Sequence, residues 1–469
     1  MRLFPLLAFA ALTAAPAAPA AAQPRPAPIA ELARSVSIPY EEFTLPNGLR
    51  VLVHTDRKAP VVATSIYYHI GSKNEPKGKT GFAHLFEHMM FYGSENAPGD
   101  YFKRLQDIGA TDYNGTTWYD RTNYFQTVPT GALDRILFLE SDRMGHLLGG
   151  ITQEKLDNQR GVVQNEKRQG DNAPFGTVDY LVSATLFPEG HPYRHSTIGS
   201  MADLNAASLA DVKQWFASNY GPNNAVLVLA GDIDLPTAKA KVTRWFGDIP
   251  RGPEVKRVTA PVPTLAAPVE RVMTDAVPFA RVQRTWAVEG VNGRDTTALA
   301  AAGAILGGLS ASRLDNALVR EEKLAVGVAA SLQAHEDIGL FEVSANVRAG
   351  QDPKAVAARL DAIMADFLAT GPTEDEVRRV ATKQIANRIV GYETVGGFTG
   401  KASELAEGLL YSGDPAHYRR ELADYAALTP ARVRDAAQRW LSRPAFRLTI
   451  VPGAQIGRAS CRERVYYTV

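Results

Sequence analysis

Two histidines and a glutamate between Gly81 and Gly93 have the spacing His-x-x-Glu-His. On a helix, His84 and His88 leave the same face one turn apart, which is the arrangement that two ligands of one metal ion need. Glu87 would lie beside the same cation. Zinc makes a water acidic enough for a nearby carboxylate to take its proton at neutral pH. The pattern therefore predicts a hydrolytic metal site; the alternative is two ordinary histidines on an amphipathic helix.

A third metal ligand must come from another part of the chain, because catalytic zinc sites typically have three protein ligands and one open position. Apolar residues over 152–169 recur at helical spacing, and this helix offers two acids. Glu166 follows Val162 and Val163, which would pin the helix to the core and hold the carboxylate near the metal. Glu154, at the start of the helix, is more simply a surface acid that compensates the helix dipole. The residues alone leave the role of Glu166 open.

The composition narrows the class of protein. The chain has 469 residues, of which 45% are hydrophobic and 22% charged, so it suits two or more domains with sizeable cores. Its 51 basic and 50 acidic side chains give a net charge of +1, which offers no global attraction for nucleic acid or an anionic membrane. The single cysteine, Cys461, excludes a cysteine zinc cage and an intramolecular disulfide. Histidines and carboxylates must therefore hold any metal.

The two ends of the chain are expected to lie outside the folded domains. Residues 1–22 have the pattern of a cleavable secretory signal peptide, with a basic start and an apolar run from Leu3 to Ala15. The run is too short for a membrane anchor, so we expect a periplasmic or secreted protein. Residues 23–40 are expected to be a flexible leader. Residues 456–469 read like a translated sequencing adapter and are expected to be a non-native tail.

Two similar halves are expected between these ends. The proline-rich residues 251–268 predict an extended linker between an N-terminal zinc-binding catalytic domain (41–250) and a C-terminal homologous domain (269–455). Each domain closes with a helix that contains a tryptophan, then an apolar strand, then glycine. This pattern occupies residues 209–231 before the linker and 428–453 after it. The recurrence indicates an internal duplication.

Strand and helix patterns occur in groups within each half. Residues 61–70 are β-branched and aromatic, as expected of a sheet strand. Residues 131–144 and 152–169 have apolar residues at helical spacing. Strands grouped in hairpins and followed by runs of helices favour an α+β fold over a parallel, doubly wound sheet. We therefore expect two homologous domains, each a mostly antiparallel sheet covered on one face by helices.

The motif and its surroundings resemble the pitrilysin/insulinase family of inverted zincins, and within it the bacterial zinc-protease branch related to mitochondrial processing peptidase. The resemblance rests on Gly81-x-Ala-His-x-x-Glu-His-Met-x-Phe-x-Gly93 and on Val162-Val-x-Asn-Glu166. It covers about residues 41–453, including the duplication. It implies a zinc metallopeptidase whose chain forms one half of a clamshell.

For the site, the resemblance implies one zinc ion per chain, held by His84, His88 and Glu166. Glu87 is then the general base. The resemblance also implies that Asn114 contacts bound peptide from a strand near the site. From the residues alone, Asn114 and the following glycine fit a turn equally well. In the family, the peptide pairs with an exposed sheet edge as an added strand.

Two departures from the family pattern bear on activity. Gln159 stands where many members have a second glutamate that supports the site, and an amide supplies no negative charge. In the second domain Arg320 is kept as a substrate-binding residue, but its partner tyrosine is absent at Val326 and Gly327. In the family this Arg/Tyr pair positions substrate and stabilises the developing oxyanion. A second homologous chain or a missing C-terminal half would supply the pair and close a chamber around the peptide.

We therefore expect a zinc-dependent endopeptidase that hydrolyses peptides or small unfolded proteins in the periplasm through a zinc-activated water. The alternatives are a non-catalytic family member that acts as scaffold or partner subunit of a homologous active chain, and a zinc carrier. A scaffold has no need for all four site residues, and a carrier would have a more open, histidine-rich site. His191 and His195, in an Arg/His-rich loop, are expected to be structural residues. No nucleic acid and no stable membrane anchor after signal cleavage are expected.

Overall fold

The structure is a computed structural model that describes residues 28–453. The signal peptide expected over 1–22 and the tail expected over 456–469 lie outside these residues. Within the expected leader, α1 (Ile29–Ser35) is a helix that packs against helices of the second half. This stretch is structured where a flexible leader is expected, because Ala33 and Ile38 are buried. None of the described helices is both long and apolar enough to cross a membrane.

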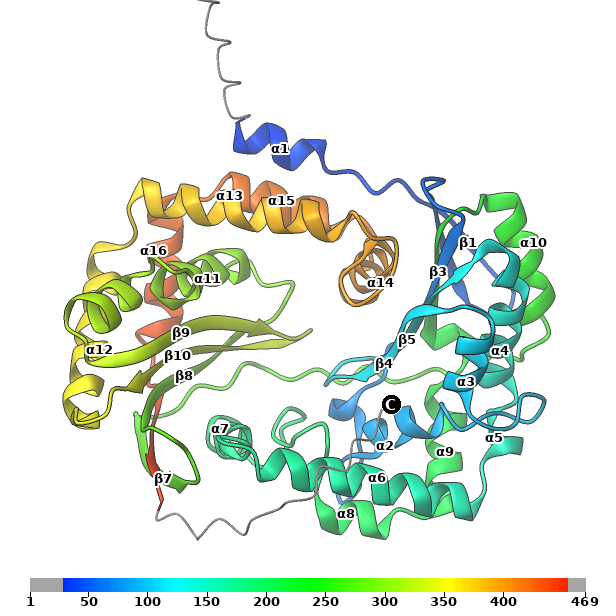
Figure 1. Cartoon of the computed structure of the whole chain (residues 1–469), viewed down its shortest axis with the longest axis horizontal. Coiled ribbons are helices and arrows are strands. Elements are labelled where there is room, and N and C mark those ends of the chain that lie inside the picture. Colours follow the sequence, from blue (N-terminus) through cyan, green and yellow to red (C-terminus); the bar gives the residue numbers. More distant parts are fainter. Residues whose placement is uncertain (1–27, 454–469) are drawn as a thin grey trace, which may run out of the picture.

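Eleven strands in the described part of the chain form two mixed sheets (Figure 1). In the order of the first sheet they are β1 (Glu41–Thr44), β2 (Arg50–Thr55), β6 (Ala225–Gly231), β3 (Val61–Tyr68), β5 (Thr122–Pro129) and β4 (Thr111–Thr117). The second sheet has the order β7 (Val269–Asp275), β11 (Phe446–Pro452), β8 (Arg281–Glu289), β10 (Ile338–Val347) and β9 (Ala325–Ala334). Each sheet contains one parallel pair, β2 with β6 and β7 with β11, and all its other neighbours are antiparallel.

Helices follow the strands in the same order in both halves. The first half contains η1 (Ser72–Asn74), α2 (Phe82–Met89), α3 (Tyr101–Asp107), η2 (Thr130–Ala132), α4 (Leu133–Gly145), α5 (Leu147–Gly150), α6 (Gln153–Asp171), α7 (Val178–Leu186), α8 (Met201–Ala206), α9 (Leu209–Asn219), η3 (Pro222–Asn224) and α10 (Leu235–Phe246). The second contains α11 (Thr296–Gly303), the π-helical turns η4 (Ala304–Gly308) and η5 (Asp315–Glu321), α12 (Pro353–Thr370), α13 (Glu374–Gly391), α14 (Lys401–Ser412), α15 (His417–Ala426) and α16 (Pro430–Leu441).

The shared order of elements reflects the internal duplication. In the chain, α2 lies between β3 and β4, and α11 lies between the equivalent strands β8 and β9. The tryptophan-containing helices α9 and α16 precede β6 and β11, which have the same place in their sheets. The expected α+β fold, with two homologous and mostly antiparallel sheets, is confirmed.

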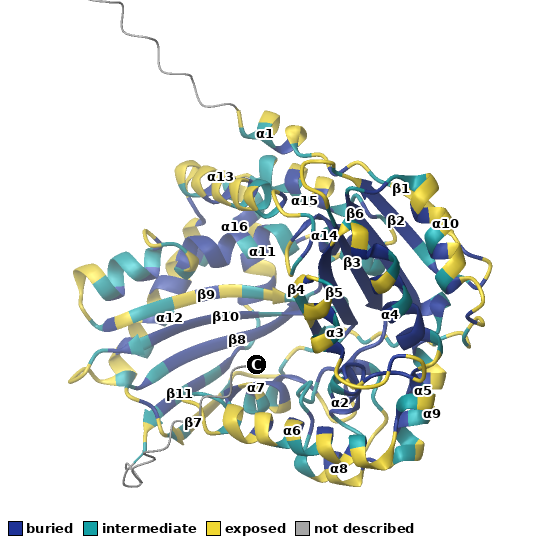
Figure 2. Cartoon of the chain, turned by 45° about the vertical axis from the view of Figure 1, so that its right-hand side comes forward, coloured by how far each residue is buried: buried dark blue, intermediate teal, exposed yellow. Residues whose placement is uncertain are grey.

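The two halves exchange one helix each. Helix α14, from the second half, packs on β3 and β6 of the first sheet, where Leu405 and Leu409 join a core with Ala63. Helix α7, from the first half, packs on β8 and β11, where Val178 and Val182 face the second sheet. The expectation that helices cover only one face of each sheet is therefore wrong. Both faces of the central strands are covered, which is why β3, β6 and β8 are buried almost throughout, whereas outer strands such as β9 are more exposed (Figure 2).

A buried lysine fastens the two halves to each other. Lys73, in η1, has a side chain that is only 4% exposed, and its ammonium lies 3.0 Å from Asp120 between β4 and β5. It also lies 2.7 Å from Glu336 and 3.1 Å from Asp337, both in the turn between β9 and β10. The three carboxylates therefore surround one desolvated cation from both halves.

We expect Lys73→Met to lower the free energy of unfolding by about 3 kcal/mol or more, because the buried Asp120 and two half-buried carboxylates lose their counter-ion. The matched control is Lys103→Met, which removes the exposed pair with Asp107 on α3 and should cost less than about 0.5 kcal/mol. Urea denaturation followed by tryptophan fluorescence measures both values. Equal, small losses for the two variants would contradict the role of Lys73.

Candidate metal centre

Helix α2 presents its two histidines because its opposite face is fixed to the core. Leu85, Phe86 and Met89 are buried, and the ring of Phe86 stacks on Phe216 of α9 with centroids 5.5 Å apart. The helix starts after Gly81, whose φ of +91° favours glycine. A Cβ at that position would also lie 2.7 Å from the carbonyl oxygen of Ile198. The start and the orientation of α2 are therefore both set by packing.

Helix α6 brings Glu166 to the two histidines. Thr152 caps the helix by accepting a hydrogen bond from the Lys155 amide, and α6 packs against α2. Gln159 and Val163 are buried on the side of the helix that also carries Glu166. The expectation that Val162 helps to pin this helix is wrong: its side chain is 41% exposed, because adjacent residues on a helix point about 100° apart.

The three side chains form a group with the dimensions of one metal site. The ligand atoms of His84, His88 and Glu166 all lie within 4.8 Å of one another. Glu166 Oε2 is 3.4 Å from His88 Nε2 and 3.7 Å from His84 Nε2. Tetrahedral zinc with ligands at 2.0–2.2 Å separates the ligand atoms by roughly 3.3–3.6 Å. The group therefore fits zinc, and three protein ligands leave a fourth position open.

The protonation of the three groups also suits a metal. Burial and the neighbouring His88 lower the pKa of the His84 imidazole to about 4, so His84 is neutral at pH 7. Burial is the largest single effect on His88 and opposes its charge, but the hydrogen bond to Glu166 and the charges of Glu87 and Glu166 together raise the pKa of His88. The same bond lowers the pKa of the Glu166 carboxyl. The pairing with Glu166 thus makes His88 bind a proton more tightly than a free imidazole does, and a metal ion has to compete with that proton.

Glu87 is a buried carboxylate next to the metal group in the chain. Its side chain is buried, and within residues 28–453 its Oε2 has no hydrogen-bond partner. Burial raises the pKa of the Glu87 carboxyl, while the Thr117 hydroxyl and the charge of Arg121 act in the opposite direction. A buried, unpaired carboxylate oxygen beside a metal group is costly unless it has a function or a bound partner.

Gln159 and Asn114 both lie in the surroundings of the group. Gln159 is buried, donates to the side-chain Oδ1 of Asn158 at 2.7 Å and helps to raise the pKa of His88 through a hydrogen bond. Asn114 lies within the edge strand β4, exposed, where it pairs with Phe125. The turn alternative for Asn114 is therefore wrong, because the chain continues as a strand through Gly115.

Arg320 lies in the other half of the molecule. Its side chain is 57% exposed and donates to Asp315 at 2.6 Å and to the Ser310 carbonyl oxygen, all within the segment around η5. No contact with the metal group is formed by Arg320 within the described chain.

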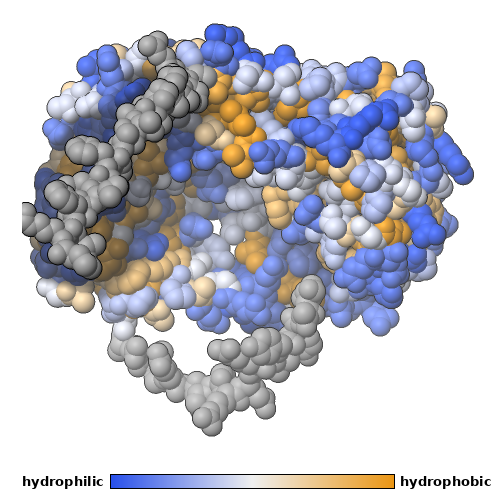
Figure 3. Space-filling model, turned by 45° about the horizontal axis from the view of Figure 1, so that its top comes forward, coloured by the Kyte–Doolittle hydropathy of each residue, from blue (hydrophilic) through white to orange (hydrophobic). Residues whose placement is uncertain are grey.

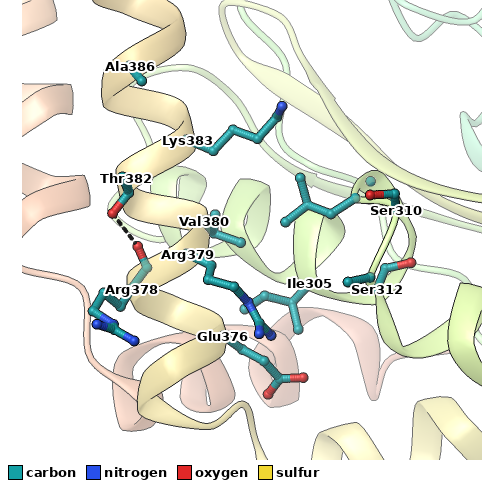
Figure 4. A pocket seen from close by; sticks show the side chains of 13 residues that line it. Ile305, Ser310, Ser312, Glu376, Arg378, Arg379, Val380, Thr382, Lys383 and Ala386 are labelled. Atoms are coloured by element: carbon teal, nitrogen blue, oxygen red, sulfur yellow. Dashed lines mark hydrogen bonds between the residues drawn. The ribbon is translucent and has the colours of Figure 1, made fainter. Parts of the chain in front are cut away.

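The equivalent crevice of the second half has lost the metal ligands. It is a cavity of about 680 Å³ that lies between η4, the loop after η4, and α13 (Figure 4). In chain order, α11 with its continuation η4 corresponds to α2, and α13 corresponds to α6. Ile305 and Val380 are among the side chains that line it. Among the described residues of its lining there is no histidine, and the one acid, Glu376, is bound by Arg313 at 2.8 Å. This crevice therefore offers no comparable ligand set.

A second acidic cluster and a buried arginine are defined by the fold and not by any local sequence pattern. Asp120, Glu336 and Asp337 form the other cluster of potential ligands in residues 28–453, but the ammonium of Lys73 already lies between them and pairs with all three. Arg121, buried behind Glu87, was missed by the sequence analysis. No local signal marks it, because its position depends on the register of β4 against β5.

Two family models match the chain. One, described as insulinase (peptidase family M16), matches residues 50–197, which contain all four residues of the group. The other, described as peptidase M16 inactive domain, matches residues 206–384. The second range includes the crevice that lacks metal ligands.

Similar proteins and structures extend over most of the chain. Zinc protease PqqE of Helicobacter pylori is 28% identical over 368 residues, which are 76% of this chain and 80% of the relative. The β-subunit of the mitochondrial-processing peptidase of Blastocladiella emersonii is 25% identical over 399 residues, 81% of each chain. A protease structure from Helicobacter pylori has a TM-score of 0.78 at 24% identity and covers 89% of this chain and 100% of its own.

A second structural relative relates the chain to a longer protein. The first half of the periplasmic protease PqqL from Escherichia coli has a TM-score of 0.72 at 20% identity, over 88% of this chain and 92% of that half. The structure of whole PqqL matches this chain with a TM-score of 0.73, and the matched part is 47% of the PqqL chain. In fold, this chain therefore corresponds to one half of PqqL.

We expect Glu166→Gln to weaken zinc binding more than about a hundredfold, because an amide replaces a charged ligand. Glu154→Gln, an exposed change on the same helix, should leave the affinity unchanged. Competition with a chromophoric chelator measures both dissociation constants. A similar affinity for Glu166→Gln and the unmodified protein would exclude Glu166 as a ligand.

Zinc affinity should fall as the pH is lowered from about pH 8 to about pH 6. The reason is that Glu166 raises the pKa of His88, so that protons compete with the metal for this imidazole as the pH falls. Titration calorimetry in buffers of different ionisation enthalpy measures the number of protons released. An affinity and a proton release that do not change with pH would contradict the His88–Glu166 pairing.

Proposed function

The chain belongs to the insulinase family of peptidases, family M16, and on that premise we propose that it is a zinc-dependent endopeptidase acting on peptides or small unfolded proteins. The observation that carries the proposal is the convergence of His84, His88 and Glu166 within 4.8 Å, beside a buried carboxylate with an unpaired oxygen. This combination suits hydrolysis better than storage of a metal, which needs no such carboxylate.

Each residue of the group has a separate task in the proposed reaction. His84, His88 and Glu166 would hold the ion, and zinc, when bound, supplies a Lewis acid that polarises the scissile carbonyl and acidifies the attacking water. Glu87 takes the proton of that water on Oε2 and returns a proton to the leaving amine. The raised pKa of Glu87 favours both transfers, since the protonated carboxyl is less costly in its buried site.

Strand β4 is the proposed docking edge for the peptide. It is the last strand of its sheet, its only sheet neighbour among the described residues is β5, and it packs beside α2. Its outer edge leaves main-chain donors and acceptors for an added strand. Exposed Asn114 on this edge would bind the peptide backbone, so that recognition depends on an extended conformation more than on side chains.

The working enzyme is proposed to contain a second half. The chain corresponds in fold to one half of PqqL. The tyrosine expected to accompany Arg320 is also absent, because Val326 and Gly327 stand at its place. The surface between the two domains is hollowed, as one wall of a chamber would be (Figure 3). A second homologous chain or a C-terminal half would complete the chamber. A non-catalytic partner subunit is the alternative, and the intact set of four residues in the first domain disfavours it.

The proposed location is the periplasm or the exterior. It is supported by the signal-peptide pattern of residues 1–22 and by PqqL, which is named a periplasmic protease. Peptides that have left the cytoplasm would then be the substrates.

We expect Glu87→Gln to lower the hydrolysis of an internally quenched peptide by a factor of about a hundred to ten thousand, because the proton acceptor is lost. Bound zinc, measured by atomic absorption, should stay at one ion per chain. Equal hydrolysis by both proteins would remove Glu87 from the mechanism. Zinc binding without hydrolysis by the unmodified chain, alone or with a homologous partner, would favour the scaffold.

A further inference from the structure

A fully buried carboxylate lies at the N-terminus of the helix that carries the two histidines. The Glu75 side chain has no exposed surface. One of its oxygens accepts a hydrogen bond from the Gly81 amide at 2.9 Å, and the other accepts one from the Ala83 amide at 2.8 Å. Glu75 therefore caps α2, although it lies six residues before Gly81, the residue in the N-cap position.

Helix α2 depends on this remote cap because it has none of its own. Its N-cap residue is Gly81, which has no side chain to accept the free amides of the first turn. The helix has only eight residues, so an unfastened first turn is a large part of it. A carboxylate at this end also compensates the positive end of the helix dipole.

His195 holds Glu75 in place. Its Nε2 lies 3.0 Å from Glu75 Oε2 and 3.0 Å from the Ser72 carbonyl oxygen. Burial is the largest single effect on His195 and opposes its charge, but the hydrogen bond to Glu75, the charge of Glu75 and the Ser72 carbonyl together raise the pKa of His195. His191 in the same loop differs, because its ring stacks on Phe187 and its Nε2 faces the Pro261 carbonyl oxygen.

Within the described chain, the orientation of the His84 ring is not fixed by a hydrogen bond to its second nitrogen. Metal-binding imidazoles normally donate their second ring nitrogen to a neighbouring group that fixes the ring. Within residues 28–453, His84 Nδ1 is buried and has no hydrogen-bond partner. The ring is therefore aimed by the backbone of the first turn of α2, to which Glu75 is bonded.

We propose that Glu75 and His195 are a positioning pair, which fixes the first turn of α2 so that His84 meets the metal held by His88 and Glu166. The inference rests on the proposed zinc site. Neither residue touches the metal or the substrate. They act through the backbone between Gly81 and His84.

The test compares zinc dissociation constants and steady-state kinetics of the full chain for Glu75→Gln, His195→Ala and the double variant. Glu75→Gln should weaken zinc binding on the order of tenfold, and His195→Ala a few fold. Because the two act as a unit, the double variant should match Glu75→Gln. At saturating zinc, kcat should fall while KM stays unchanged. The control is Asp352→Ala, which removes the cap of α12 in the second half and should leave zinc binding unchanged.

A merely structural role would lower the melting temperature and leave the zinc affinity of the folded protein within about twofold; that result would overturn the proposal. Independent, multiplicative losses in the double variant would also overturn it. If Glu75→Gln does not fold, His195→Ala decides alone, since its side chain is 25% exposed. Failure of the unmodified chain to bind zinc would instead overturn the proposed function, and this inference with it.

Discussion

The proposed chemistry depends on one long-range contact, between the Glu166 carboxylate on α6 and the imidazoles of His84 and His88 on α2. The two histidines share a helix turn, so their spacing is local. The acid comes from a helix that follows α2 only after two strands and the helices α3, α4 and α5, and only the packing of α6 against α2 brings it within 3.4 Å of His88. That packing rests on the buried Val163 and Gln159. The metal group is thus a property of the folded domain and not of the motif.

Contacts elsewhere in the molecule fix the position of α2 and of the sheet beside it. The α2 face opposite the histidines is fixed by aromatic packing, and its first turn is bonded to Glu75. Exchange of α7 and α14 covers the second face of each sheet, so each half completes the core of the other. Lys73 lies two residues before Glu75 and binds acids of both halves. The docking of the second half is therefore coupled, through a short segment, to the start of the helix that carries the metal ligands.

Local patterns predicted much of this structure. The duplication, the strand near residue 61 and the helix of Glu166 are all set by periodicity and by punctuating residues, and they were foreseen. The side-chain direction of Val162 was not, since a pair of adjacent valines cannot both face one core. The exchanged helices, the burial of Lys73 and the position of Arg121 behind Glu87 depend on how distant elements dock. His195 was foreseen as structural, but its partner Glu75 becomes visible only when the loop folds back onto α2.

The most direct measurement of the central contact is anomalous diffraction at the zinc edge from crystals of the zinc-loaded protein. The account predicts one strong peak per chain, about 2.0–2.2 Å from one nitrogen of His84, one nitrogen of His88 and one oxygen of Glu166. A peak bound by other residues, or one bound by the two histidines with the Glu166 carboxylate turned away, would contradict it.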